Sequence, residues 1–135
     1  MADQHDLIHL LSQAERQVTQ RLREMLLAEG CSLERWRVLQ LLGDGKSHSM
    51  SELAEFALLP APTLTRLIDR MVSDNLLYRR IDERDRRRTL VHLTQRGEAL
   101  CRRVTKAVQR HHTELAAAVG DSAYFGEVLQ RLADL

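Results

Sequence analysis

The feature that most constrains this chain is a short amphipathic segment followed directly by two β-rich stretches. Over residues 62–75 apolar side chains recur at three- and four-residue steps on one side while the opposite side stays polar, which predicts a helix with one buried face. Residues 76–81 and 89–93 are rich in β-forming side chains, and the charged loop 82–88 joins them. We therefore expect a helix and then a small β-hairpin in the middle of the chain.

Helical periodicity covers most of the chain before this segment. Apolar side chains recur at helical spacing over residues 7–26, and Gly30 is expected to end that long helix. Ser32 is a candidate N-cap for a second helix, and either Ser49 or Ser51 is expected to open a third, short one. The segment is thus preceded by one long helix and two shorter ones.

Two further helices are expected after the hairpin. Thr94 is a candidate cap for a long helix whose apolar stripe runs over residues 100–119, and residues 120–122 separate it from a last helix over 125–132. The chain is therefore predicted to be mainly α with a small β-hairpin. A short helix, a turn, a second helix and a basic hairpin, in this order, are typical of a winged helix-turn-helix.

Length and composition fit a single folded domain. The chain has 135 residues, of which 44% are hydrophobic and 29% are charged, close to the averages of globular proteins. The longest apolar run, residues 115–119, is far too short to cross a bilayer. Residues 1–6 lack the basic flank and apolar stretch of a secretory signal. We expect a soluble cytoplasmic protein that does not associate with membranes.

Charge is distributed unevenly along the chain. The formal net charge is only +1, but residues 61–110 carry thirteen basic and six acidic side chains, and residues 1–60 and 111–135 are both net negative. Eighteen of the twenty basic residues are arginine, and six of these fall within residues 79–88. Because the planar arginine fork suits bidentate contacts to phosphate and guanine, a nucleic-acid surface is favoured over a solvated face with ion pairs.

The basic region holds two motifs, TRLIDRM at residues 65–71 and DRR at residues 85–87 followed by LVHLT at residues 90–94. Together they resemble signatures of the MarR family of bacterial transcriptional regulators. The heptapeptide TRLIDRM at residues 65–71 is similar to the recognition-helix signature of that family. Asp85-Arg86-Arg87, followed by LVHLT at residues 90–94 and by Gly97, is similar to its wing signature. Asn75 stands where the family often has glycine, and asparagine also tolerates the left-handed turn that ends a helix. The resemblance extends over nearly the whole chain.

The resemblance implies a fold and a set of partners. One winged helix-turn-helix domain would span residues 1–135, with a DNA-binding lobe at 33–93 and dimerisation helices at 1–30 and 94–135. The first and last helices of two copies would interlock in a homodimer that holds two winged lobes over one double-stranded DNA operator. The implied function is that of a DNA-binding transcriptional regulator, most simply a repressor.

The same resemblance implies roles for individual residues. Arg87 would be the wing arginine that enters the minor groove, and Asp85 the carboxylate that orients it. The expected DNA-binding side chains are Thr63, Thr65, Arg66, Arg70, Arg84, Arg86 and Arg87.

The leading hypothesis for regulation is release from DNA by a small aromatic or anionic ligand. The resemblance implies a pocket between the dimerisation helices and the winged lobe. His9, Arg16, Trp36 and Arg37 are candidates to line it, although the arginines also fit surface ion pairs and the tryptophan also fits the core.

Two other sensing mechanisms are kept as alternatives. Cys31 or Cys101 would serve a redox sensor, whereas the default for buried cysteines is an inert thiol. A metal sensor would use His5, Asp6 and His9 near the N-terminus, with the pair at 111–112 and Glu114 as additional ligands. A nucleoid-type DNA binder that has no effector is the non-regulatory alternative.

Catalysis is not expected. The sequence offers no glycine-rich phosphate loop, no nucleophile elbow and no paired metal-ligand motif. No catalytic residue, cofactor or bound metal is therefore predicted.

Overall fold

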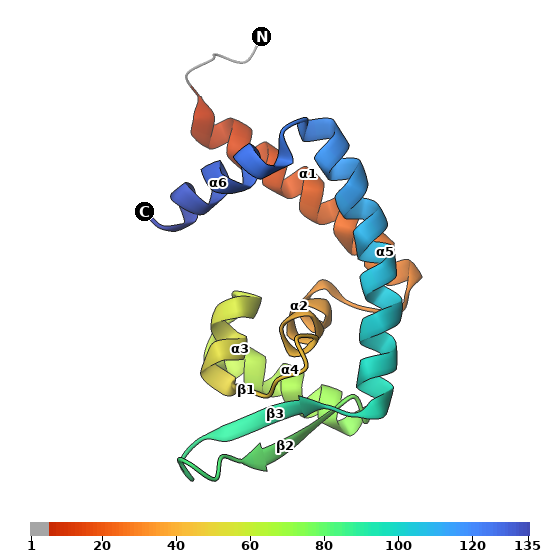
Figure 1. Cartoon of the computed structure of the whole chain (residues 1–135), viewed down its shortest axis with the longest axis vertical. Helices are drawn as coiled ribbons and strands as arrows, with labels where there is room; N and C mark the ends of the chain where they lie inside the picture. Colours follow the sequence, from red (N-terminus) through yellow and green to blue (C-terminus); the bar gives the residue numbers. More distant parts are fainter. Residues whose placement is uncertain (1–5) are drawn as a thin grey trace.

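The computed structural model describes residues 6–135 and has the helix and hairpin order expected from the sequence (Figure 1). Its elements are α1 (Leu7–Ala28), α2 (Leu33–Leu42), β1 (His48–Ser49), α3 (Met50–Ala57), α4 (Ala61–Ser73), β2 (Leu77–Ile81), β3 (Thr89–Leu93), α5 (Gln95–Val119) and α6 (Ser122–Ala133). The mainly helical winged fold is confirmed. No helix within residues 6–135 combines the length and the apolar character that a membrane span requires.

Side-chain caps mark the first turns of α2, α3 and α5, and also those of α1 and α6. The Ser32 hydroxyl accepts a hydrogen bond from the backbone N–H of Arg35, as expected for the start of α2. Ser49, rather than Ser51, caps α3. Thr94 caps α5 by accepting from the backbone N–H of Gly97. These short polar residues satisfy N–H groups that a helix start otherwise leaves without partners.

The sheet differs from the expected hairpin because it has a third strand. β1 pairs antiparallel with β3, so the strand order is β1-β3-β2, with His48 opposite Val91 and Ser49 opposite Leu90. The hairpin itself, β2 with β3, has Leu77 opposite Leu93. A strand of two residues is too short to show a period-two pattern, which is why the sequence did not predict it.

Two turns use the left-handed backbone conformation at residues other than glycine. Asn75 has φ of 61° directly after α4, as predicted. Leu58 has φ of 58° at the C-cap of α3, which was not predicted. Leucine tolerates this conformation poorly, since its Cβ approaches the next carbonyl, so the tertiary structure imposes the turn that leads from α3 into α4.

The hydrophobic core lies in the lobe made by α2, α3, α4, the sheet and the first half of α5. Leu39, Leu53, Ile68, Val91 and Val104 have no exposed surface. These residues come from five different elements, so the core fixes the position of α4 relative to the sheet.

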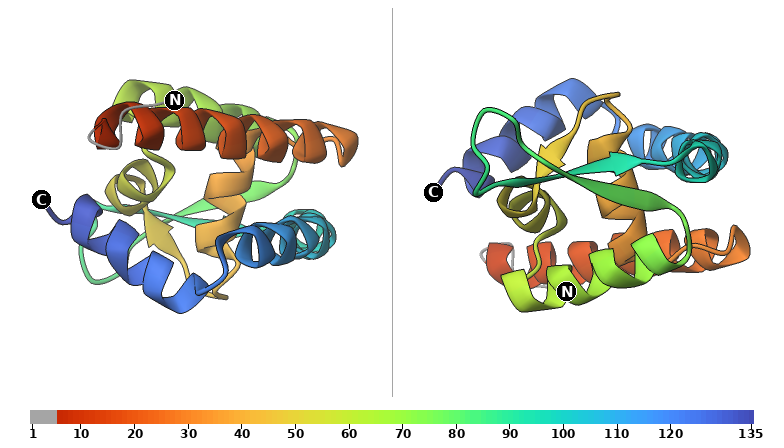
Figure 2. Two further views of the ribbon diagram at one scale, coloured as in Figure 1. Left: turned by 90° about the horizontal axis from the view of Figure 1, so that it is seen from above. Right: turned by 90° about the horizontal axis from the view of Figure 1, so that it is seen from below.

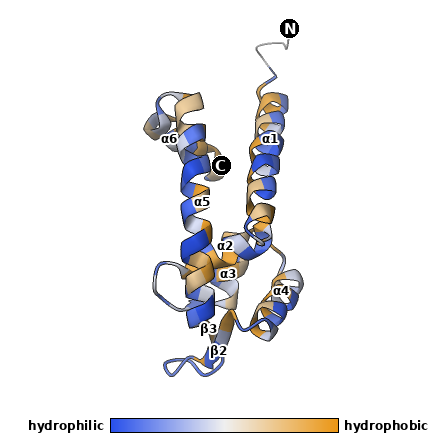
Figure 3. Cartoon of the chain, turned by 90° about the vertical axis from the view of Figure 1, so that its right-hand side faces the viewer, coloured by the Kyte–Doolittle hydropathy of each residue, from blue (hydrophilic) through white to orange (hydrophobic). Residues whose placement is uncertain are grey.

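The two terminal helices leave apolar side chains uncovered. α1 and α6 lie at the same end of the molecule, on the side away from the sheet (Figure 1), and the end-on views of Figure 2 separate them to opposite edges. The hydropathy colouring of Figure 3 alternates along α1. Leu26 is the only α1 residue that is buried, and α6, which lies wholly within the described residues, has none. The exposed apolar side chains on these helices include Leu7, Ile8, Leu10, Leu11, Tyr124, Phe125, Leu129 and Leu132.

The first turn of α5 packs directly on the backbone at the start of the hairpin. The Thr94 N–H donates to the carbonyl of Leu76 at 3.0 Å, and the Thr94 hydroxyl donates to the carbonyl of Asn75 at 2.7 Å. A Cβ at Gly97 would lie 2.1 Å from the same Leu76 oxygen. Only glycine therefore allows α5 to approach the sheet this closely.

We predict that Gly97→Ala destabilises the fold, because a methyl group in this position forces two backbone segments apart. The expected loss in the free energy of unfolding is at least about 1–3 kcal/mol, the usual cost of overpacking, measured by urea unfolding. Gly126→Ala is the control, since a Cβ there meets nothing within 4 Å and alanine favours the helix by about 1 kcal/mol. Equal unfolding midpoints for Gly97→Ala and the wild type would contradict the packing described above.

Candidate nucleic-acid interface

Helix α4 has one buried face and one exposed face. Leu64, Ile68 and Met71 lie in the core with at most 1% exposure, which anchors the helix to the lobe. Arg66 and Arg70 lie one turn apart on its exposed side. Neither arginine forms an ion pair in the part of the chain that the structure describes, so both guanidinium groups are available to a ligand outside the lobe.

The two threonines of the predicted interface differ in exposure. Thr65 is exposed, and its hydroxyl donates to the carbonyl of Ala61 at 2.9 Å within the helix. Thr63 is half-buried near the start of α4. A contact to a partner molecule is therefore more accessible at Thr65 than at Thr63.

An ion pair ties α4 to the hairpin. Asp69 accepts from the guanidinium of Arg79 on β2. This pairing neutralises one carboxylate and one cation between the two elements. It leaves the exposed face of α4 basic.

The loop between β2 and β3, which we call the wing tip (residues 82–88), is shaped by its aspartates. The Asp82 carboxylate accepts from the backbone N–H of Arg84 at 2.9 Å. The Asp85 carboxylate accepts from both the backbone N–H and the side-chain Nε of Arg87, at 3.1 and 3.2 Å. These bonds to Arg87 lower the pKa of the Asp85 carboxyl below its usual value.

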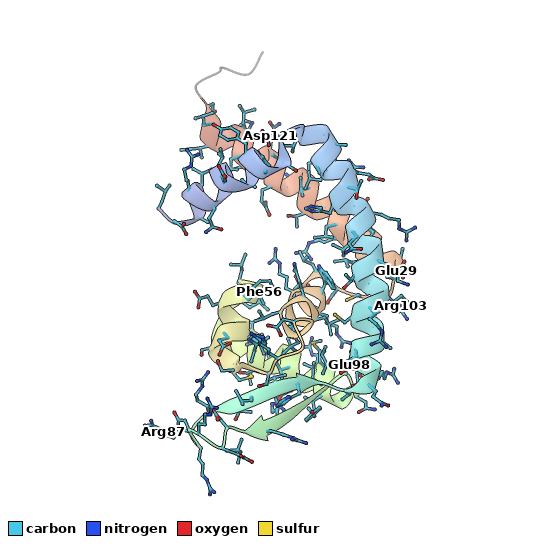
Figure 4. The ribbon with its side chains drawn as sticks, viewed as in Figure 1. Glu29, Phe56, Arg87, Glu98, Arg103 and Asp121 are labelled. Carbon is cyan, nitrogen blue, oxygen red and sulfur yellow. The ribbon has the colours of Figure 1, made fainter. Side chains whose placement is uncertain are left out.

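Arg87 projects from the end of the wing tip (Figure 4). Its side chain is 92% exposed, although its Nε donates to the Asp85 carboxylate. Arg84 and Arg86 are also exposed and form no ion pair among residues 6–135. The wing tip thus presents three accessible guanidinium groups.

A series of polar contacts that was not predicted connects the turn after α2, β1 and α3 to the end of the wing tip. His48 lies between two carboxylates, with Nε2 at 2.8 Å from Asp44 and Nδ1 at 2.7 Å from Glu52. The other oxygen of Glu52 accepts from Arg88 at 2.9 Å. Arg88, the last residue of the wing tip, is consequently turned toward α3. Asp44 lies in the turn after α2, His48 in β1 and Glu52 in α3, so no helical periodicity connected the three residues in the sequence.

The two carboxylates change the protonation of His48. Burial opposes the charged imidazole, but the hydrogen bonds and charges of Glu52 and Asp44 outweigh it, and the pKa of His48 is raised. A raised pKa means that this contact stabilises the fold fully below the ordinary histidine pKa and less as pH rises through the raised value. The contact of His48 with Asp44 and Glu52 is therefore strongest at mildly acidic pH.

The four residues proposed from the sequence for effector binding do not meet in one cavity of a single chain. Trp36 is a core residue with 5% exposure. The guanidinium of Arg37 donates to the carbonyl of Ala57 at 3.3 Å. His9 and Arg16 are exposed on α1.

Two hollows within the described residues are lined by none of these four side chains. One, of about 900 Å³, lies between the end of α2, the sheet and the first half of α5. The other, of about 510 Å³, lies between α1 and α5. The buried Nε2 of His111, a residue that lines the smaller hollow, has no hydrogen-bond partner among residues 6–135.

The cysteine and histidine candidates also fall into separate places. Residues 6–135 hold no group of three or more side chains able to bind a metal ion together; His5 lies outside the described residues. Cys31 and Cys101 are both free and buried. Burial raises the pKa of the Cys31 thiol to about 11 and also raises that of Cys101. Neither thiol is activated at neutral pH.

We predict that both thiols of the native protein react slowly with a disulfide reagent such as DTNB. With a pKa near 11, only about one Cys31 in 10⁴ is a thiolate at pH 7. Labelling at pH 7 is expected to be at least about 100-fold slower than that of free cysteine, with both thiols reacting promptly in guanidinium chloride. The variant Cys31→Ser assigns the remaining signal to Cys101. Fast stoichiometric labelling of native Cys31 would show that it is accessible and activated.

An anchored helix with free arginines on its outer face, beside a basic wing, defines a winged helix-turn-helix DNA-binding regulator. The sequence profile of the MarR family matches residues 31–89. The uncharacterized HTH-type transcriptional regulator YwoH of Bacillus subtilis is 30% identical over 115 residues, which cover 85% of this chain and 83% of YwoH. The protein belongs to the MarR family.

Other relatives agree over a longer span. The homoprotocatechuate degradative operon repressor of Escherichia coli is 26% identical over 132 residues, 97% of this chain and 86% of that protein. The crystal structure of the MarR family transcriptional regulator SPO1453 from Silicibacter pomeroyi superposes with a TM-score of 0.84 at 29% identity, covering 96% of this chain and 94% of that one. The similarity therefore includes the terminal helices as well as the lobe.

Proposed function

We propose that this protein represses transcription by binding a double-stranded operator as a homodimer, and that a small aromatic anion releases it. The observation that carries the proposal is the pairing of two surfaces on one lobe. Arg66 and Arg70 project from α4, and Arg87 projects from a wing tip that Asp85 orders. A helix of this kind fits the major groove, and an arginine at a wing tip fits a narrow minor groove.

The remaining residues of the interface support these two contacts. Thr63 and Thr65 lie near the start of α4, where they would hydrogen bond to phosphate or base edges. Arg84 and Arg86 flank the wing arginine and would neutralise phosphates. In this division residues 33–93 form the DNA-binding lobe, and residues 1–30 and 94–135 form the dimerisation helices.

We predict that Arg66→Ala and Arg87→Ala weaken operator binding by different routes. Arg66→Ala is expected to cost about 1–3 kcal/mol of binding free energy and to relax base preference at one position in each half-site. Arg87→Ala is expected to weaken binding and to reduce its salt dependence, since fewer counterions are released. Asp85→Ala should act in the same direction as Arg87→Ala by freeing that side chain. Fluorescence anisotropy at several salt concentrations measures all three.

Arg110→Ala is the matched control for these variants. Arg110 is exposed on the second half of α5 and forms no ion pair among the described residues. Its loss removes one positive charge without touching the lobe. Wild-type affinity for Arg66→Ala and Arg87→Ala together would exclude the proposed contacts. Equal affinity for operator and random duplex at one salt concentration would favour the nucleoid-type binder instead.

The homodimer is inferred from the apolar side chains that the terminal helices expose. Ile8 is 83% exposed and Tyr124 is 57% exposed, on helices that stand away from the core. A monomer would leave this surface in water, whereas a two-fold pairing of the same helices would cover it. Dimerisation would also place two copies of α4 on one face of the DNA.

We predict a dimer at micromolar concentration in analytical ultracentrifugation. Ile8→Asp and Phe125→Asp introduce charges into the exposed apolar faces of α1 and α6, so each is expected to shift the distribution toward monomer. Glu127→Ala on α6 is a control that leaves the apolar residues intact. A wild-type protein that sediments as a monomer would remove both the dimer and its paired half-sites.

The proposed ligand is a small aromatic acid. One relative is by name the repressor of an operon for degradation of homoprotocatechuate. In this chain His9 and Arg16 on α1 and Arg37 on α2 present exposed or half-buried cationic and polar groups. These residues do not form a pocket in one chain, so the proposed pocket is completed by the second copy.

We predict that at least one member of a panel of aromatic acids binds in isothermal titration calorimetry and lowers operator affinity. Arg37→Gln should weaken that binding by removing a cation, whereas Arg96→Gln, at an exposed residue that lines neither hollow, should not. If no member of the panel binds, the proposed effector class is wrong. Release from the operator by peroxide, lost in Cys31→Ser, would favour redox control despite the buried thiols.

The location and class of the protein follow from the same proposal. A regulator that binds the operator works where the DNA is, so a cytoplasmic location is inferred. Regulation of transcription, and not catalysis, is the inferred activity.

A further inference from the structure

The larger hollow lies on the side of the sheet that faces away from α4. Tyr78 and His92 sit opposite each other in the hairpin and line the hollow together. Arg79, the next residue along β2, is opposite the buried Val91 and reaches Asp69 of α4. Because neighbouring residues of a strand point to opposite faces, the hollow and α4 occupy opposite faces of the sheet. A molecule in the hollow would leave the DNA-reading face of α4 free.

Two walls of the hollow carry cations. Lys46 comes from the loop after α2, and Arg102 and Lys106 lie one turn apart on α5. None of the three forms an ion pair within residues 6–135. The neighbouring Arg103 differs, since it donates to the carbonyl of Glu29 at 2.9 Å and faces the Glu29 carboxylate (Figure 4). Glu98 is the one carboxylate in the lining.

Leu42, Leu93 and Cys101 supply the apolar side chains of the lining. Leu42 and Cys101 are buried, and the Cys101 thiol is held by its hydrogen bond to the carbonyl of Leu39 at 3.4 Å. The rings of Tyr78 and His92 stack with centroids 4.9 Å apart and planes 9° from parallel. The hollow therefore combines an apolar floor, a rigid aromatic wall and cations on the two other walls. A volume of about 900 Å³ is ample for a small organic molecule.

We propose that this hollow is a binding site for a small planar organic anion. The apolar body of the ligand would lie on Leu42 and beside the Tyr78–His92 pair, and its anionic group would lie between Lys46 and the two cations of α5. The anion would relieve the mutual repulsion of three unpaired positive charges. This site differs from the effector region on α1 and α2 and does not depend on the proposed function.

The walls belong to parts of the molecule with different roles. One wall is formed by β2 and β3, and another by α5, which leads into α6. A bound anion would therefore contact the hairpin and α5 at the same time.

Calorimetric titration of the full-length protein with 1-naphthyl phosphate tests the site, because this probe joins a planar apolar body to a phosphate dianion. The double variant Arg102→Gln/Lys106→Gln is expected to bind about tenfold more weakly or worse, as two charge-assisted contacts are lost. Arg96→Gln is the matched control, since Arg96 is exposed on α5 and does not line the hollow. Inorganic phosphate and 1-naphthol, each carrying half of the probe's chemistry, are expected to bind at least about tenfold more weakly than the probe.

Amide chemical shifts locate the bound probe. Shifts at Gly43, Gly45 and Thr105, all in the lining, that disappear in the double variant would support the site. Thermal unfolding of the variants confirms that they are folded. The proposal is overturned if the probe does not bind at millimolar concentration or if the double variant binds it as tightly as the wild type. It is also overturned if phosphate alone binds equally well or if the shifts are confined to α1 and residues 33–37.

Discussion

The contact on which the rest of this structure depends is the close packing of the first turn of α5 against the carbonyl of Leu76. That oxygen accepts from the Thr94 N–H, while the absent side chain of Gly97 leaves room for it. Residues 76 and 94 mark the two ends of the hairpin, so one junction closes the hairpin and sets the direction in which α5 leaves it. The angle between the wing and the long helix is consequently a property of backbone packing, which is stiffer than any surface contact.

Ion pairs then orient the sheet within the lobe. The ion pair of Asp69 with Arg79 connects α4 to β2, and the ion pair of Glu52 with Arg88 connects α3 to the end of the wing tip. Exposed pairs of this kind contribute little to stability one at a time. Their effect here is selective, because each removes one arginine from a crowded basic surface. Among residues 6–135, Arg66 and Arg70 on α4 and Arg84 and Arg86 at the wing tip form no ion pair and are exposed. Arg87 pairs only with Asp85 of the same loop and stays 92% exposed, so these five arginines face outward.

The sequence predicted the elements whose signals are local. Ser32 and Thr94 cap helices as expected, and Asn75 adopts the left-handed turn, since each depends only on its near neighbours. β1 was missed because its two residues gain their strand conformation only by pairing with β3, more than forty positions away. The left-handed turn at Leu58 was missed because tertiary packing overrides the preference of leucine. Asp85 and Arg87 are in contact, whereas the predicted roles of both on DNA and of the effector residues remain proposals.

The distribution of charge connects the fold to its partner. The basic residues are concentrated in the segment that forms α4, the wing and the start of α5, whereas residues 1–60 and 111–135 are net acidic. A uniform positive charge would attract DNA in any orientation and would repel a second copy of the chain. Confining it to the lobe steers DNA toward the wing and α4, and it spares the exposed apolar faces of α1 and α6 from the repulsion that two basic surfaces would experience on contact. The same short basic segment thus permits both the pairing of two chains and their approach to one duplex.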